Sequence, residues 1–231
     1  MRVIIENGPK GKKVVATAWD WPGLERNGKT EEEAIAKLGT YLPRYLSVAK
    51  RARLGKAFSD DGPLEVVERY DGTGSTDFWG ISFAPSSLDD VVQADADFQR
   101  WIALLKACWA EFDDVAARVT PDLRKGPRGG GRDRAQIVNH VFANEHSWMP
   151  RPPGVKPSED IMLTPDVLIE HRKNYLEALR REHAAGTIRI GRSWTLSYLI
   201  RHTCYHVLDH AWEMEDKDLS EVAGDVDEVA G

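Results

Sequence analysis

Cysteine is scarce in this chain of 231 residues, which contains only Cys108 and Cys204. Two cysteines provide no disulfide framework, so we expect both to be buried free thiols in a reducing compartment. Long apolar runs are missing as well. The chain begins MRVIIENGPK, where the apolar stretch is too short for a signal-peptide core or a bilayer span. These features predict a cytoplasmic protein with no membrane partner.

Positive charge is not in excess either. The sequence has 31 Lys and Arg against 37 Asp and Glu, a formal net charge of −6. A protein that binds nucleic acid through its phosphates needs a positive surface, so we expect no nucleic-acid partner. Hydrophobic residues make up 42% of the chain, which is enough for a folded core.

Charge and histidine are distributed unevenly, which predicts two domains. Residues 1–60 carry a net positive charge, and the rest of the chain carries a net negative one. All histidines follow residue 139: His140, His146, His171, His183, His202, His206 and His210. We therefore predict an N-terminal domain over 1–75, a helical domain over 86–216 and an acidic, disordered tail over 217–231. The connecting segment at 71–87 is rich in glycine and serine, and its aromatic residues should pack down.

The N-terminal domain has the pattern of a small α+β unit. Two β-type runs, Val3–Ile5 and Val14–Ala18, flank a Gly-Pro-Lys-Gly turn and predict a hairpin. A helix should begin at Thr30, whose hydroxyl can cap it while Glu33 reaches back to complete a capping box. Pro43 should kink or break this helix, and Leu64–Tyr70 then returns to strand. The predicted order is β-β-α-β.

The segment VVATAWDWPGLERNGKTEEEAIAKL, at 14–38, joins a strand, a Pro-Gly turn and a capped helix. In this respect the first 70 or so residues resemble the HicB-like antitoxin domain. HicB proteins usually add a DNA-binding helical module, but a different kind of sequence follows here. The resemblance implies an accessory domain that packs, dimerises or covers a site, and a homodimer is one expectation.

Four helical stretches are expected between residues 86 and 216. The clearest has apolar residues at alternating steps of four and three, a seam for packing against other helices, and ends before Pro121. Its members are Phe98, Ile102, Leu105, Trp109, Phe112, Ala116 and Val119. The others should run from 133 to about 148, from 164 to 185 and from 193 to about 216. A four-helix bundle without strands is the simplest architecture.

The last helix carries His202, His206 and His210 at steps of four. Residues four apart on a helix differ by about 40° around the axis and about 6 Å along it, so the three form one stripe. Two imidazoles at this spacing can share one metal ion, but three on a straight helix cannot. A third ligand must therefore come from another helix.

Which histidines can bind the metal depends on which face of each helix points into the bundle. The packing seam of the last helix includes His206 and His210 and leaves His202 at its flank. On the second helix, His140 lies on the comparable inward stripe. We therefore predict a metal site made of His140, His206 and His210. We expect His146 and His183 to be ordinary hydrogen-bonded or exposed side chains, and leave His171 open.

The motifs IVNHVFANEHSW and RHTCYHVLDHAWEMED give residues 86–216 a resemblance to the DinB-like family. That family consists of four-helix bundles in which a histidine of the second helix and an H-x3-H pair of the last helix bind a divalent metal. The resemblance implies that His140, His206 and His210 bind zinc, nickel or a similar ion. It also implies a low-molecular-weight thiol as cosubstrate, such as bacillithiol, mycothiol or glutathione. The acidic end of the last helix departs from several relatives.

Three neutral imidazoles leave a coordination position open, which favours a catalytic site acting on a small-molecule substrate. The leading hypothesis is a metal-dependent thiol S-transferase or a thiol-dependent isomerase. A metal-dependent hydrolase stays open, as does a non-catalytic interaction or regulatory protein that uses the HicB-like domain. No catalytic residue is assigned. Asp209 is a candidate for support of a ligand, and Glu145 and Glu213 for proton transfer, but we interpret each first as a solvated surface charge.

The loop KGPRGGGRDR, at 125–134, precedes the second helix of the predicted bundle. It is not a phosphate-binding loop, because no Gly-Lys-Ser/Thr follows the glycines. We interpret it as a solvated connection. The alternative is that its arginines meet the carboxylates of a peptide-like thiol at the rim of the pocket.

Overall fold

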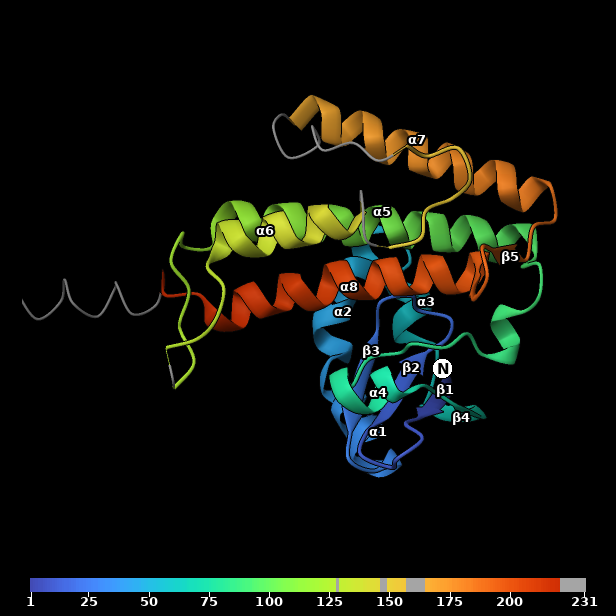
Figure 1. Ribbon diagram of the computed structural model, residues 1–231, viewed down its shortest axis with the longest axis horizontal. Helices are drawn as coiled ribbons and strands as arrows, with labels where there is room; N and C mark the ends of the chain where they lie inside the picture. The colour runs from blue at the N-terminus through green and yellow to red at the C-terminus, as the bar shows by residue number, and fades with distance from the viewer. Residues whose placement is uncertain (128, 146–148, 157–164, 221–231) are drawn as a thin grey trace, which may run out of the picture.

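The computed structural model describes residues 1–127, 129–145, 149–156 and 165–220 (Figure 1). Its fold is mixed α+β, with a four-stranded sheet and longer helices in the second half of the chain. The strands are β1 (Arg2–Asn7), β2 (Val14–Ala18), β3 (Glu25–Gly28), β4 (Glu65–Asp71), β5 (Arg189–Ile190) and β6 (Trp194–Thr195). The helices are α1 (Glu31–Thr40), α2 (Leu42–Arg51), α3 (Gly55–Ser59), α4 (Gly74–Trp79), the 3-10 turn η1 (Ser87–Asp89), α5 (Asp95–Arg118), α6 (Arg134–Ala143), α7 (Pro165–Ala184) and α8 (Leu196–Lys217).

The N-terminal sheet has the strand order β3-β2-β1-β4. Strand β1 pairs antiparallel with β2 and parallel with β4, and β2 pairs antiparallel with β3. The predicted hairpin and the returning strand are therefore present. The predicted order β-β-α-β is incomplete, because it omits β3 and the short helix α3.

Strand β3 was missed because its sequence, Glu-Arg-Asn-Gly, contains no apolar or β-branched residue. Tertiary partners allow it to be buried. Thr17 and the backbone N–H of Ser82 donate hydrogen bonds to the carboxylate of Glu25 at 3.0 and 2.9 Å. Arg26 donates to Asp209 of α8 at 3.2 Å. Long-range polar contacts thus replace the apolar pattern that normally marks a strand.

Helix α1 begins as predicted, but its capping box is modified. The hydroxyl of Thr30 accepts the backbone N–H of Glu33 at 3.2 Å. The carboxylate of Glu33 reaches back to the N–H of Lys29, at 2.8 Å, and not to that of Thr30. Pro43 lies in the first turn of α2, where its missing N–H is harmless.

Helices α5, α6 and α8 run alongside one another, and α7 lies over them (Figure 1). Tyr175 of α7 contacts both Trp109 of α5 and Thr203 of α8, which fixes α7 against this pair. Helix α6 begins after Asp133, whose side chain completes a capping box with Gln136. Its predicted last residues, 146–148, lie outside the described part of the chain.

The expectation of a helical half without strands is wrong in one place. Strands β5 and β6 form a short antiparallel ladder just before α8. Trp194 and Thr195 belong to this ladder, so α8 begins at Leu196 and not near Ser193. The hydroxyl of Thr195 caps the helix by accepting the N–H of Tyr198 at 3.1 Å.

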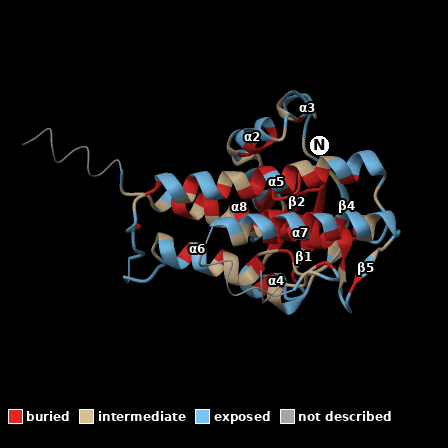
Figure 2. Cartoon of the chain, turned by 90° about the horizontal axis from the view of Figure 1, so that it is seen from above, coloured by how far each residue is buried: buried red, intermediate tan, exposed pale blue. Residues whose placement is uncertain are grey.

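One continuous apolar core joins the sheet to the helices. Its buried residues run through the contact between the sheet and helices α5 and α8 (Figure 2). Trp19, which follows β2, packs edge-on against Trp101 of α5 with ring centroids 4.9 Å apart. At the far end of α8, Arg44 of α2 pairs with Glu215 at 2.6 Å and with Asp216 at 2.8 Å. The acidic end predicted from the sequence therefore binds α2.

Cys108 and Cys204 are buried free thiols, as predicted. Among the described residues, no helix combines the length and the apolarity needed to cross a bilayer. Of the predicted tail over 217–231, residues 221–231 lie outside the described part. Asp218, just after α8, accepts a hydrogen bond from the backbone N–H of Thr120 at 2.9 Å.

A buried polar cluster fastens the segment after β4 to the sheet. The carboxylate of Glu6 accepts hydrogen bonds from the hydroxyls of Thr76 and Ser82 and from the N–H of Phe83, at 2.5, 2.6 and 3.0 Å. Beside it, burial raises the pKa of the Glu25 carboxyl from 4.5 to about 7, against the hydrogen bond from Ser82. The predicted connection over 71–87 does pack down, but chiefly through these polar contacts and not through its aromatic residues, since Phe78 and Trp79 are exposed.

A buried ion pair fastens the same region to α8. The guanidinium of Arg201 donates two hydrogen bonds to Asp89 of η1, at 3.0 and 2.6 Å. Both side chains are almost fully excluded from solvent. Such a pair contributes more to defining one arrangement than to net stability, because both charges lose their hydration.

Gly23 is where the turn after β2 meets α8. A Cβ atom here would lie 2.8 Å from Leu208 Cδ1 and 3.2 Å from Cys204 Cβ, and φ is +97°. We expect Gly23→Ala to lower the free energy of unfolding by about 2–4 kcal/mol, from overpacking and a left-handed backbone. Chemical denaturation provides the measurement. Gly11→Ala is the matched control, with φ +62° and open space around it; equal losses in both variants would contradict the close approach to α8.

The raised pKa of Glu25 predicts a pH dependence of stability. Between pH 4.5 and about 7 the carboxyl is ionised in the unfolded chain but protonated in the folded one, so stability falls as pH rises. Glu25→Gln keeps the shape and removes the titration. From about pH 5 to about pH 8 the wild type should lose up to about 3 kcal/mol more unfolding free energy than Glu25→Gln. Glu65→Gln, which removes an exposed carboxylate, should show the same pH profile as the wild type. If the profiles of wild type and Glu25→Gln were parallel, the pKa of Glu25 would not be raised in the folded protein.

Candidate metal centre

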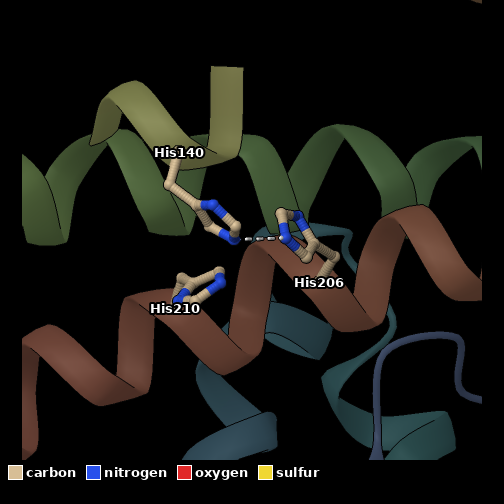
Figure 3. A group of neighbouring side chains, drawn as sticks. All are labelled: His140, His206 and His210. Carbon is tan, nitrogen blue, oxygen red and sulfur yellow. Dashed lines mark hydrogen bonds between the residues drawn. The ribbon is translucent and has the colours of Figure 1, made fainter. Parts of the chain in front are cut away.

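Helices α6 and α8 bring three histidines together. His206 and His210 lie on successive turns of α8, and His140 projects toward them from α6 (Figure 3). Nε2 of His140 and Nε2 of His206 are 3.3 Å apart. One ring nitrogen from each histidine lies within 4.8 Å of the other two. The structure thus places the three predicted rings around a common point; we call them the triad.

The spacing of the triad matches the demands of a metal ion. Two nitrogens bound to one tetrahedral ion at about 2.1 Å lie about 3.4 Å apart. The pair formed by His140 and His206 already has this separation. A small ring movement of His210 would bring the third nitrogen to the same distance, since all lie within 4.8 Å.

Glu213 fixes the orientation of His210. Its carboxylate lies 2.8 Å from Nδ1 of His210 and 2.5 Å from Nζ of Lys217. The hydrogen bond from His210 and the one from Lys217 lower the pKa of Glu213 to about 2. An ionised Glu213 accepts the Nδ1 proton of His210 and leaves the Nε2 lone pair available to a ligand, as carboxylates do beside metal-binding histidines.

The rings of His140 and His206 are uncharged at neutral pH. Burial, with the charges of His210 and Arg132, lowers the pKa of His140 to about 4. Burial, followed by the neighbouring histidines, holds the pKa of His206 well below its usual value. Neutral imidazole is the form that binds metal, so these rings need not release a proton first.

His206 is held in place without a full set of hydrogen bonds. Its Nδ1 is buried and has no hydrogen-bond partner within the described residues. Leaving a buried polar atom in this state costs about 1–3 kcal/mol. A cation bound at Nε2 would leave this cost in place, so the orphaned Nδ1 does not itself indicate a metal. What fits a divalent cation of the zinc or nickel type is the convergence of three imidazole nitrogens.

His202 belongs to the same stripe but not to the triad. Tyr198 donates its proton to the carbonyl of Ser82 at 2.8 Å, so the hydrogen bond of 3.4 Å between Tyr198 and Nδ1 of His202 has the tyrosine oxygen as acceptor. The proton of His202 is therefore on Nδ1, and Nε2 carries the lone pair. The ring is also packed against Trp194, with centroids 5.0 Å apart.

A cavity of about 450 Å³ opens beside the triad. Its lining includes all three rings together with aromatic and polar side chains from both halves of the chain. The aromatic members are Trp79, Phe83, Trp194 and Tyr205, and the other polar ones are Arg132, Asn144, His202 and Asp209. Its size and mixed lining are typical of a small-molecule site. Sequence reasoning missed the contribution of the segment at 79–83.

The candidate supporting residues differ in their positions. Of the three carboxylates considered, Glu213 contacts the triad directly. Asp209 instead pairs with Arg26 at 3.2 Å. Glu145 is buried and accepts a hydrogen bond from Trp109 at 2.9 Å. In the loop at 125–134, Arg132 lines the cavity.

The remaining histidines lie elsewhere. His183 stacks on Phe98 with ring centroids 3.9 Å apart and contacts Asp95 at 2.9 Å, an ordinary structural role. His171 lines a separate cavity of about 730 Å³ beside α7. That cavity is larger, but among the described residues it holds no group of three metal donors. His146 is also outside the described residues.

Comparison with protein-family models, with curated proteins and with solved structures finds no match to this chain. The DinB-like and HicB-like resemblances therefore remain predictions from the sequence motifs.

The triad predicts one strong metal site. Untagged protein should bind about one equivalent of Zn²⁺ or Ni²⁺, and His206→Ala should weaken binding at least about 100-fold by removing one of three ligands. Equilibrium dialysis with elemental analysis measures both. His202→Ala is the matched control, since this ring lies on the same helix stripe outside the triad, and it should retain the metal once circular dichroism shows an intact fold. Equal metal content in wild type and His206→Ala would show that the triad is not the metal site.

Proposed function

We propose that this protein is a metal-dependent enzyme in which the triad holds one divalent cation and a small molecule reacts in the adjacent cavity. The observation that carries the proposal is the convergence of His140, His206 and His210 on the wall of that cavity. A purely structural metal site is normally closed by four protein ligands. Here three imidazole nitrogens face a space large enough for a substrate.

The reaction class we propose is transfer of a small thiol, or isomerisation that depends on such a thiol. When bound, the cation would supply a Lewis acid that lowers the pKa of a thiol or a water. Because all three ligands are neutral, none of them offsets the charge of the ion. The resemblance to the DinB-like family supports a thiol as the cosubstrate.

The carboxylates near the triad favour a thiol over water. Hydrolytic metal sites generally use a carboxylate as general base for the attacking water. Among the described residues that line the cavity, the carboxylate is Asp209, which is held by Arg26. Glu213 is occupied by His210 and Lys217. A thiol with a pKa of about 8.5 needs less help from a base than water does.

The chain's own residues would prepare the site in two ways. The hydrogen bond from His210 to Glu213 orients one ligand, and loss of such a contact commonly weakens metal binding about 10–100-fold. The aromatic lining of the cavity keeps much of the surrounding space apolar, which strengthens electrostatic interactions near the triad.

The thiol-transfer proposal predicts metal-dependent conjugation. In zinc-loaded or nickel-loaded protein, the sulfur of glutathione, mycothiol or bacillithiol should replace the chlorine of 1-chloro-2,4-dinitrobenzene, releasing chloride and the thiol proton. The rate should fall at least about 100-fold in His206→Ala because the Lewis acid is lost. Absorbance of the conjugate measures the rate. His183→Ala, a histidine remote from the triad, should keep the wild-type rate.

Two outcomes would contradict this proposal and identify another function. Turnover of activated esters or amides without any thiol would indicate a hydrolase. Absence of turnover with all three thiols, together with a stable protein complex on pull-down, would indicate an interaction protein that uses its N-terminal domain.

A further inference from the structure

Trp79 has an exposure that folding does not explain. It is 65% exposed, and its neighbour Phe78 is 74% exposed. Each of the other tryptophans in the described ranges is buried or half-buried. A large exposed ring gains little from folding, but Trp79 lines the cavity beside the triad, where a ligand could cover it.

The structure holds Trp79 rigidly despite this exposure. Asp77, two residues earlier on α4, accepts backbone N–H hydrogen bonds from three residues of the β1–β2 turn at 2.6, 2.7 and 3.2 Å. The side chain of Asn27 donates to the carbonyl of Gly80, the residue after Trp79, at 2.6 Å. A ring carried on such a fixed support is positioned before any ligand arrives, which lowers the entropic cost of binding.

A second tryptophan lines the same cavity from another part of the chain. Trp194, in β6, packs against Tyr198 and His202 with ring centroids 4.7 and 5.0 Å away. Phe83, just beyond the end of α4, adds a third ring to the lining. Aromatic walls of this kind favour a flat ligand, because stacking and edge contacts both require a ring partner.

The charges around the cavity select the sign of the ligand. Arg132 lines it and has no ion pair or hydrogen bond within the described residues. Asp209, the acidic member of the lining, is paired with Arg26, whose guanidinium stacks on Tyr41 at 3.5 Å. A cation on the triad would add further positive charge. Aromatic cages often bind organic cations, but this one would repel them.

We infer that the cavity binds a flat aromatic carboxylate, with Trp79 and Trp194 contacting its ring and Arg132 pairing with its carboxylate. This inference rests on the proposed function, for which it names the class of substrate. A two-ring carboxylate is within the size range of a cavity of about 450 Å³. Arg132 suits the role because a guanidinium can donate two parallel hydrogen bonds to one carboxylate.

Titration calorimetry of the full chain with 2-naphthoate tests the inference, in both metal-loaded and chelator-treated protein. Wild type should bind 2-naphthoate at least about 10-fold more tightly than 2-naphthylmethylammonium, which has the same rings and the opposite charge. Trp79→Ala and Arg132→Gln should each weaken naphthoate binding at least about 10-fold. Arg132→Lys should recover part of the loss, since it restores the charge but not the paired donors.

Two matched controls isolate the cavity. Phe78→Ala removes the other exposed ring of the same helix, which packs edge-on against Trp79 with ring centroids 4.6 Å apart but does not line the cavity. Arg192→Gln removes an exposed arginine outside the lining. Arg192→Gln should bind naphthoate like the wild type, and Phe78→Ala should weaken binding less than Trp79→Ala does. Equal affinity for the anionic and cationic probes, equal effects of Trp79→Ala and Phe78→Ala, or no saturable binding would each overturn the inference.

The same experiment separates this inference from the proposed function. If the protein takes up no metal but binds naphthoate in a way that depends on Trp79 and Arg132, the carboxylate site is supported and the metal-dependent enzyme is refuted. Metal-dependent thiol transfer, together with naphthoate binding that neither substitution weakens, would support the enzyme and refute the proposed aromatic carboxylate site.

Discussion

Burial of α8 on most of its surface is the constraint on which the rest of the structure depends. The turn at Gly23 packs directly on its backbone, Arg201 is paired with buried Asp89, and Tyr198 is hydrogen-bonded to the carbonyl of Ser82. These contacts come from three different segments and fix the rotation of the helix about its axis. Once that rotation is set, His206 and His210 must face α6, and His140 meets them there.

The electrostatics of the site follow from the same burial. Partial removal from water keeps His140 and His206 neutral, with the pKa of His140 lowered to about 4. Glu213 orients His210 from the wetter end of the stripe. The N-terminal sheet also takes part, because Arg26 neutralises Asp209 and the segment after β4 supplies the wall that contains Trp79. The site is therefore assembled from both halves of the chain, over one continuous core.

Local patterns predicted the parts of the protein that depend on local physics. Steps of four along the last helix place His206 and His210 on one stripe, and the seam that includes Leu199 and Thr203 gives the direction of that stripe. The capped start of α1, the break at Pro43 and the return to strand at β4 were predicted from local signals of the same kind. His140 could be chosen as the third ligand because it lies on the inward stripe of the helix that became α6.

The parts that could not be predicted depend on partners distant in sequence. Strand β3 has no apolar pattern because Glu25 and Arg26 are buried by contacts with Ser82 and Asp209. The β5–β6 ladder is two residues long on each side, too short for a periodic signal. The aromatic residues of the connection at 71–87 were expected to pack it down, but Trp79 is 65% exposed. Its place on the cavity wall is set by hydrogen bonds from the β1–β2 turn to Asp77. Such features become visible only in three dimensions.

Anomalous diffraction from crystals of the metal-loaded protein tests the central claim most directly. The account predicts one strong peak at the absorption edge of the bound metal, about 2.1 Å from a ring nitrogen of each of His140, His206 and His210. A peak elsewhere in the molecule, or fully loaded protein with no density between these three rings, would contradict it.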